Sequence, residues 1–246
     1  MSGRDDFFVG WAGQLPRADA ARFVIRVGLG CAVLLLVGLL LGRGQDDPGA
    51  AGFDPAGEVT RRGVLTLLPY PTLWSAPDAS HPAGHAMLLA GEGKRGAPVA
   101  PAWEGRTVDA VGVIFRRGTL DMLQIDSLTL VDAGAARMPV QAEGRWRIEG
   151  EICDGKCQAG AMRPGRGIAH RACAILCLNG DIPPVFVPTG PVAGQEFLLL
   201  GNADGGPGDT AWRSLVGLRV RLDGRLERRG DMLVFLAELD KAAVVP

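Results

Sequence analysis

Two stretches of the chain share one pattern: TVDAVGVIFRRGTLDM at residues 107–122 and RVRLDGRLERRGDM at residues 219–232. At an offset of 112 residues, Gly112 matches Gly224 and the two Arg-Arg-Gly triplets coincide. Before each triplet, apolar residues alternate with other residues, which is the period of a half-buried β-strand. Each triplet supplies a glycine that tolerates the positive φ of a tight hairpin turn; a basic patch for an anionic partner is the alternative. The pattern predicts one β-module that is used twice.

The remaining strands are predicted from short apolar runs bounded by Gly- and Pro-rich turns. In the second module they lie at residues 146–152, 184–187, 196–200, 218–226 and 232–238, and in the first at 62–67, 86–89, 107–115 and 120–131, with a further strand near 71–75. Five strands with a central glycine where a strand bends suit a small closed barrel such as the OB-fold. The predicted fold class is therefore mainly β, with two tandem OB-like barrels.

A long apolar run precedes the modules at residues 23–42 and is interrupted only by Arg26. As a helix it is about 30 Å long, which matches the hydrocarbon core of a bilayer. The run predicts a single transmembrane helix in contact with lipid. A cleaved signal peptide is the alternative, but the acidic residues before the run and the absence of a clear cleavage site after it favour an anchor.

The arginines around this run predict its orientation. Arg4, Arg17, Arg22 and Arg26 precede or open it, whereas Arg43 alone follows closely. The positive-inside rule then places the N-terminus in the cytoplasm and the bulk of the chain in the periplasm, on the inner membrane of a bacterium.

These features divide the chain into five parts. They are a cytoplasmic segment, the transmembrane helix, a linker rich in Gly, Pro and Asp, and two β-modules, at residues 1–22, 23–42, 43–57, 58–140 and 141–246.

Four of the five cysteines lie in an insertion of the second module, residues 151–184, that the first module lacks. A short helix is predicted at residues 169–178, because Asn179-Gly180 and two prolines follow it. His170, Cys173 and Cys177 then lie on one helix face. Since Cβ atoms four residues apart on a helix are about 5 to 6 Å apart, Cys173 and Cys177 are too distant to form a disulfide with each other.

Three chemistries fit this insertion. The first is a pair of structural disulfides among Cys153, Cys157, Cys173 and Cys177, as an oxidising compartment favours. The second is a metal site of Cys157, His170, Cys173 and Cys177, a donor set that suits tetrahedral zinc or another soft transition metal. The third is one disulfide with a reactive pair of thiols. The histidine on the cysteine face keeps the metal site open as an interpretation.

The spacing of this insertion also resembles a known group of sequences. The run Gly150-Glu-Ile-Cys-Asp-Gly-Lys-Cys157, followed by His170-x-x-Cys-Ala-x-x-Cys177 and Gly180-x-x-Pro-Pro184, is similar to secreted bacterial OB-like domains with a Cys, His, Cys, Cys signature. The resemblance covers roughly residues 146–240. It implies an exported small barrel and no particular activity, and it leaves Cys153 outside the signature.

Other signals predict ordinary structure. Gly91-Glu-Gly-Lys-Arg-Gly96 has the letters of a dinucleotide-binding loop, but the prolines after it prevent the helix that such a site needs, so a turn is predicted. His81 and His85 are predicted to lie in a solvated loop, because no cluster of carboxylates or thiols is near them in the sequence. With 26 basic and 27 acidic residues and a single tyrosine, the chain lacks the basic, aromatic surface of a nucleic-acid binder.

The sequence therefore predicts a membrane-anchored periplasmic accessory or assembly subunit of a membrane-bound respiratory or electron-transport complex. It would contact integral membrane subunits through its barrel loops and transmembrane helix. No catalytic or cofactor-binding residue can be singled out, so a non-catalytic role is favoured. The alternatives are a periplasmic thiol- or metal-dependent redox enzyme that uses the Cys/His set, and a metal carrier.

Overall fold

The computed structural model describes residues 17–43, 51–131, 137–208 and 211–245, in two compact units that divide after Asp47. The first unit contains helix α1 (Arg17–Arg43), which includes the whole predicted apolar run. By length and composition α1 is able to cross a membrane, a property shared by membrane anchors and signal sequences.

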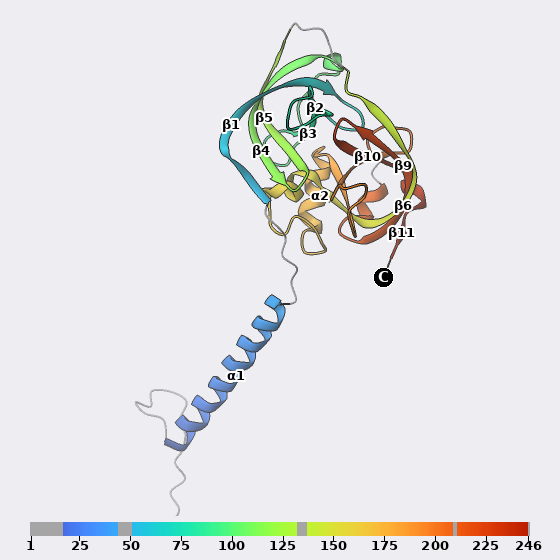
Figure 1. Ribbon diagram of the computed structural model, residues 1–246. Helices are drawn as coiled ribbons and strands as arrows, with labels where there is room; N and C mark the ends of the chain where they lie inside the picture. Colours follow the sequence, from blue (N-terminus) through green and yellow to red (C-terminus); the bar gives the residue numbers. More distant parts are fainter. Residues whose placement is uncertain (1–16, 44–50, 132–136, 209–210, 246) are drawn as a thin grey trace, which may run out of the picture. The chain divides into compact units, whose positions relative to one another are not determined.

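The first barrel of the second unit contains five strands: β1 (Ala51–Thr66), β2 (Thr72–Ser75), β3 (His85–Ala90), β4 (Thr107–Arg117) and β5 (Leu120–Leu130). They close in the order β1-β2-β3-β5-β4, and β3 and β5 are the parallel pair (Figure 1). This order is that of an OB-like barrel.

The second barrel repeats this arrangement with β6 (Val140–Asp154), β7 (Pro184–Pro188), β8 (Leu198–Asn202), β9 (Arg219–Arg229) and β10 (Met232–Ala237). Its strands run β10-β8-β7-β6-β9, with a further β9–β10 pairing that closes the barrel, and β8 and β10 are parallel. A short strand, β11 (Ala243–Val244), pairs with β9. The two predicted tandem barrels are confirmed. The first residues of β4 and β9, Thr107 and Arg219, are separated by the 112 residues of the sequence repeat.

The short helices are η1 (Pro101–Trp103), η2 (Cys157–Ala161), α2 (Arg171–Asn179), η3 (Ala211–Leu215) and η4 (Leu239–Lys241). Of these, η2 and α2 belong to the insertion between β6 and β7. The predicted helix at residues 169–178 is confirmed as α2, with a shift of one or two residues at its ends.

The turn glycines of the repeat have the predicted role, and the central glycines serve a close approach of strands. Gly118 and Gly230 make the hairpin turns with φ of 54° and 61°. Gly112 and Gly224 allow a close approach of strands: a Cβ at either position would collide with a backbone carbonyl of the neighbouring strand, that of Gln124 or Leu236. The barrel therefore needs a residue without a side chain at these two matched points.

The predicted linker at residues 43–57 is wrong from Ala51 onward. Residues 51–53 already belong to β1 and pair with the end of β4, where the ring of Phe53 lies 4.4 Å from that of Phe115. A register shift between Phe53 and Glu58 separates this pairing from the rest of β1. Gly, Pro and Asp indicate a linker only when no partner strand is available, and the long β4 supplies one.

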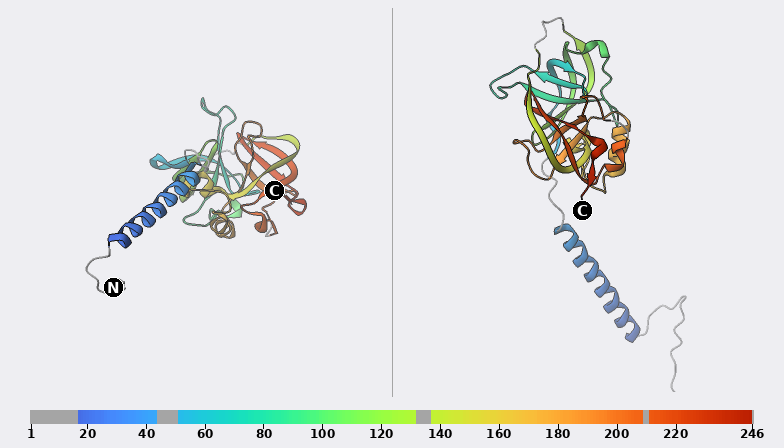
Figure 2. Two further views of the ribbon diagram at one scale, coloured as in Figure 1. Left: turned by 90° about the horizontal axis from the view of Figure 1, so that it is seen from below. Right: turned by 90° about the vertical axis from the view of Figure 1, so that its right-hand side faces the viewer.

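The barrels lie side by side and share a core (Figure 2). On β3, Met87 and Leu89 pack inside the first barrel, whereas Leu88 packs in a cluster that includes residues of both barrels. On β10, Phe235 packs inside the second barrel and Val234 packs in the shared cluster. Because both faces of these strands are buried, their sequences are continuously apolar rather than alternating.

Candidate functional site

The cysteine insertion lies between the two barrels. It leaves the second barrel at the end of β6, and its η2 segment packs against β1 and β4 of the first barrel. From there the chain reaches α2, which contacts β6. The insertion therefore places its cysteines close to the junction of the barrels, whereas other side chains of the insertion, such as Ile168 and Leu176, are exposed.

Three cysteine sulfurs converge there. Those of Cys157, Cys173 and Cys177 all lie within 4.8 Å of one another, and the Cys157 and Cys177 sulfurs are 3.9 Å apart. A disulfide requires about 2.05 Å, whereas two thiolates on one tetrahedral zinc, with Zn–S distances near 2.3 Å, are about 3.8 Å apart. The spacing of this sulfur cluster therefore fits shared coordination of one ion.

Lys94 of the first barrel contacts the sulfur cluster. Its Nζ lies 2.8 Å from the Cys173 sulfur and 3.6 Å from the Cys177 sulfur. Lys94 belongs to the loop at residues 91–96, which is the predicted turn. The Gly96 N–H donates to the Gly180 carbonyl at 2.6 Å, so this loop is fixed to the end of α2. The turn is confirmed, and it also covers the cysteines, a contact that the sequence does not reveal.

A second lysine joins the loop to the insertion from the other side. Lys156 is buried, and its Nζ donates to the carbonyls of Gly91 and Gly93 at 2.8 and 2.7 Å. Burial lowers its pKa. Two of the three lysines of the chain thus hold or contact this junction.

The cysteines of the cluster differ in their electrostatics. The hydrogen bond from the Cys157 thiol lowers the pKa of Cys177, and the ammonium of Lys94 lowers it further. The same hydrogen bond, together with burial, raises the pKa of Cys157. Thiolate character therefore concentrates on Cys177, next to a positive charge.

His170 is not part of the sulfur cluster. Its ligand atom groups instead with those of Asp154 and Cys157. Asp154 is fully buried, accepts the Cys157 N–H at 2.8 Å, and lies 3.1 Å from His170 Nε2 through its other oxygen. The predicted four-residue set is thus two overlapping groups that share Cys157, and His170 orients the carboxylate that holds this cysteine.

Cys153 lies apart from the others. It is buried, and its thiol donates to Glu151 Oε1 at 3.1 Å. Burial raises its pKa well above the ordinary value. All five cysteines are free thiols, so the predicted pair of disulfides is not formed in this structure.

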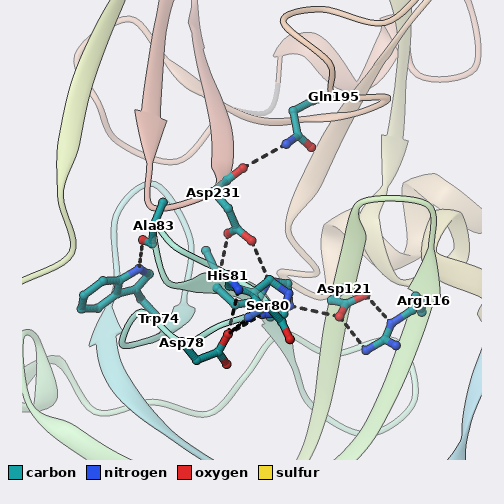
Figure 3. Close-up of polar contacts among 11 residues, drawn as sticks. Trp74, Asp78, Ser80, His81, Ala83, Arg116, Asp121, Gln195 and Asp231 are labelled. Carbon is teal, nitrogen blue, oxygen red and sulfur yellow. Dashed lines mark hydrogen bonds and ion pairs between the residues drawn. The ribbon is translucent and has the colours of Figure 1, made fainter.

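A second cluster lies at another point of the junction (Figure 3). His85, at the start of β3, lies 2.7 Å from Asp231 through Nδ1 and 3.1 Å from Asp121 through Nε2. His81 stacks on His85 with ring centroids 4.3 Å apart. Burial lowers the pKa of His85, but the hydrogen bonds to Asp121 and Asp231 outweigh it and raise the pKa to about 9.

The predicted solvated loop is therefore wrong for His85. Its carboxylate partners are 36 and 146 residues away in the sequence, and Asp231 comes from the β9–β10 turn of the other barrel. Neighbours in the sequence could not reveal them. The chain has only three lysines, and this scarcity is a sequence signal that could have drawn attention to Lys94 and Lys156.

Comparisons with models of protein families, with curated proteins and with solved structures find no match to this chain. The resemblance to secreted OB-like domains stays a prediction. Function must therefore be inferred from the geometry of the two clusters.

Proposed function

We propose that the chain is a membrane-anchored accessory or assembly subunit of a membrane-bound respiratory or redox complex, and that its sulfur cluster holds a soft metal ion such as zinc. The observation that supports the metal is the convergence of the Cys157, Cys173 and Cys177 sulfurs within 4.8 Å. Three thiolates favour zinc or copper(I) over magnesium or calcium, which prefer oxygen ligands.

The burial of the cluster supports a structural role for this metal. Cys157 and Cys177 are buried and Cys173 is partly buried, and structural metal sites are typically closed. An ion held here would join η2, which packs on the first barrel, to α2. The Lys94 ammonium would offset the negative charge of three thiolates on one divalent ion.

Asp154 and His170 are the candidates for a fourth ligand, since the ligand atoms of both group with that of Cys157. Either would add a fourth ligand to the three thiolates. His170 would then contribute as the sequence signature implies, or Asp154 would do so with His170 as its hydrogen-bond partner.

The accessory role rests on α1 and on the arginines around it. Arg17, Arg22 and Arg26 lie in its first half and Arg43 at its end, which favours a cytoplasmic N-terminus and periplasmic barrels on a bacterial inner membrane. In this arrangement the barrels would contact the outer parts of integral membrane subunits.

Elemental analysis and thiol counting on the full chain, purified in mild detergent without oxidant, test the metal. We expect one equivalent of soft metal and cluster thiols that react only after chelation. Cys157→Ser should abolish metal binding, whereas the matched Cys153→Ser, which removes a buried cysteine outside the cluster, should retain it. Cysteines that are oxidised and metal-free in this preparation would contradict the proposal.

The same preparation tests the accessory role. We expect integral membrane subunits of an oxidoreductase complex to co-purify in constant proportion with the chain. A free monomer that by itself turns over a redox substrate would overturn this part of the proposal.

Thiol redox chemistry is a second candidate, favoured by the 3.9 Å between the Cys157 and Cys177 sulfurs and the lowered pKa of Cys177. In this reaction the two thiols release two protons and two electrons and form a disulfide, while a disulfide of a partner protein accepts them and becomes two thiols. A metal-free chain with one reversible disulfide would select this candidate. Rapid exchange of bound metal with a chelator would instead select a carrier.

A further inference from the structure

We propose that His81, His85 and Asp231 form a second metal site, open to solvent, for a divalent cation of borderline softness such as zinc. The ligand atoms of these three residues lie within 4.8 Å of one another. Two imidazoles and a carboxylate are a donor set for zinc, nickel, copper(II) or iron(II) rather than for calcium. The proposal is independent of the sulfur cluster, with which it shares no residue.

The surroundings of His85 have the organisation of a metal ligand. One ring nitrogen faces Asp231 and the other lies 3.1 Å from Asp121. Asp121 is itself held by Arg116 through two hydrogen bonds of 2.8 and 2.9 Å (Figure 3). Histidines that bind metals usually donate their second N–H to a carboxylate, which fixes the ring and its tautomer. Asp121 would have this positioning role, and Asp231 would be the ligand.

Asp231 is placed by its backbone surroundings as well. Its Oδ1 accepts the Ala86 N–H at 2.7 Å, and its carbonyl accepts a hydrogen bond from Gln195 at 3.0 Å. The second oxygen, Oδ2, is thereby directed at His85. The hairpin turn of one barrel is thus fixed against the first residues of β3 in the other, so the donor set does not depend on a free loop alone.

The site opens into a cavity of about 530 Å³. Its charged lining, apart from the histidines, consists of Asp78, Asp121 and Asp231 against Arg61 and Arg116. Three carboxylates therefore face the site, against two guanidinium groups. A cavity of this size leaves room for water or a small ligand in the remaining coordination positions, unlike the closed surroundings of the sulfur cluster.

The matching contact elsewhere in the fold lacks these residues. The strand pair Leu88–Met122 of the first barrel matches the pair Leu199–Val234 of the second. Counted from these matched pairs, His85 corresponds to Glu196. Asp231 likewise corresponds to Thr119. Glu196 does lie beside Gly118, the residue before Thr119. The barrels thus approach each other at both places, and a histidine–aspartate cluster is present at only one, so docking of the barrels does not by itself require it.

Titration of the reduced, metal-free full chain in detergent with Co²⁺ tests the proposal. Thiolate-bound Co²⁺ has an intense near-ultraviolet charge-transfer band, which a site of nitrogen and oxygen ligands lacks, so the two sites are measured separately. We expect a second equivalent of Co²⁺ to bind without adding to this charge-transfer band. His81→Ala, a change on a partly exposed side chain, and Asp231→Asn, which still accepts the Ala86 N–H, should each weaken the second equivalent more than about 10-fold and leave the thiolate band unchanged.

Asp121→Asn should weaken the second equivalent by about 10- to 100-fold, as loss of an orienting carboxylate does. The control Arg61→Gln removes a positive charge from the same cavity and should leave binding unchanged or tighter. Cys173→Ser should remove the thiolate band alone, so failure of the sulfur site and failure of this site are distinguishable. Two results would overturn the proposal: a total of bound Co²⁺ that never exceeds the capacity of the sulfur site, or His81 and Asp231 variants that bind Co²⁺ as tightly as the unmodified chain. His85 would then be only an ion-pair partner of two carboxylates.

Discussion

The two barrels have the same strand order but differ in one connection. In the first barrel β1 and β2 are joined by residues 67–71, whereas in the second β6 and β7 are joined by residues 155–183. The short connection contains Tyr70, whose hydroxyl accepts the Gly208 N–H of the other barrel at 3.0 Å. The long one contains the cysteines and meets the 91–96 loop. The scaffold is duplicated, and the chemistry lies where the copies differ.

The contacts between the barrels are reciprocal. The β1–β2 connection contacts the loop after β8, and the β6–β7 connection contacts the loop after β3. The hairpin turn after β9 contacts the start of β3, and the turn after β4 contacts the segment before β8. Each candidate site therefore lies at one of two equivalent contacts between the barrels. The cysteines are present at one such contact and absent from its equivalent, and the same is true of the histidines with Asp231.

The largest expected effect concerns the core that the barrels share. Leu88→Ala removes a fully buried side chain from this core. The substitution should lower the free energy of unfolding by about 2 to 5 kcal/mol. Because the core belongs to both barrels, hydrogen exchange measured by mass spectrometry should accelerate in both. The control Leu130→Ala, at a partly exposed position on β5, should have little effect. Unchanged exchange in the second barrel would mean that the copies fold independently.

A smaller effect is expected where the insertion holds the loop of the other barrel. Lys156→Met leaves the carbonyls of Gly91 and Gly93 without their donor, which should cost about 1 to 3 kcal/mol. Amide exchange at residues 91–96 should accelerate more than in the equivalent loop after β8. Lys241→Met, at an exposed ion pair, should have little effect on the free energy of unfolding. If Lys156→Met and Lys241→Met lower the free energy of unfolding equally, Lys156 does not hold the 91–96 loop in place.

The smallest effect concerns the C-terminal addition to the second barrel. Hydrogen bonds from Lys241 and Arg145 lower the pKa of Glu238 from 4.5 to about 2. The folded-state pKa is depressed, so this carboxylate's contribution to stability is present above pH 4.5 and is lost as the pH falls toward 2. NMR titration of Glu238 should give the low pKa, and Arg145→Gln should raise it. A value near 4.5 in the unmodified chain would show that the ion pairs do not persist in solution.

Much of the scaffold was predictable because its determinants are local. Alternating apolar residues specify strands, and Gly118 and Gly230 specify tight turns by tolerating a positive φ. The same locality made α2 predictable, together with the common face of Cys173 and Cys177. Residues 51–53 are strand rather than linker because their pairing with the distant end of β4 outweighs the local composition.

The sequence by itself determined the duplicated barrel, the apolar helix and the cysteines as candidate ligands. Only the tertiary structure decided that Lys94 contacts the sulfurs, that His170 groups with Asp154 and Cys157, and that Asp231 meets His85. The physical reason is that hydrophobic periodicity specifies which face of a strand is buried but not which surface covers it. The shared core brings the barrels together, and that packing places side chains from distant parts of the chain within bonding reach.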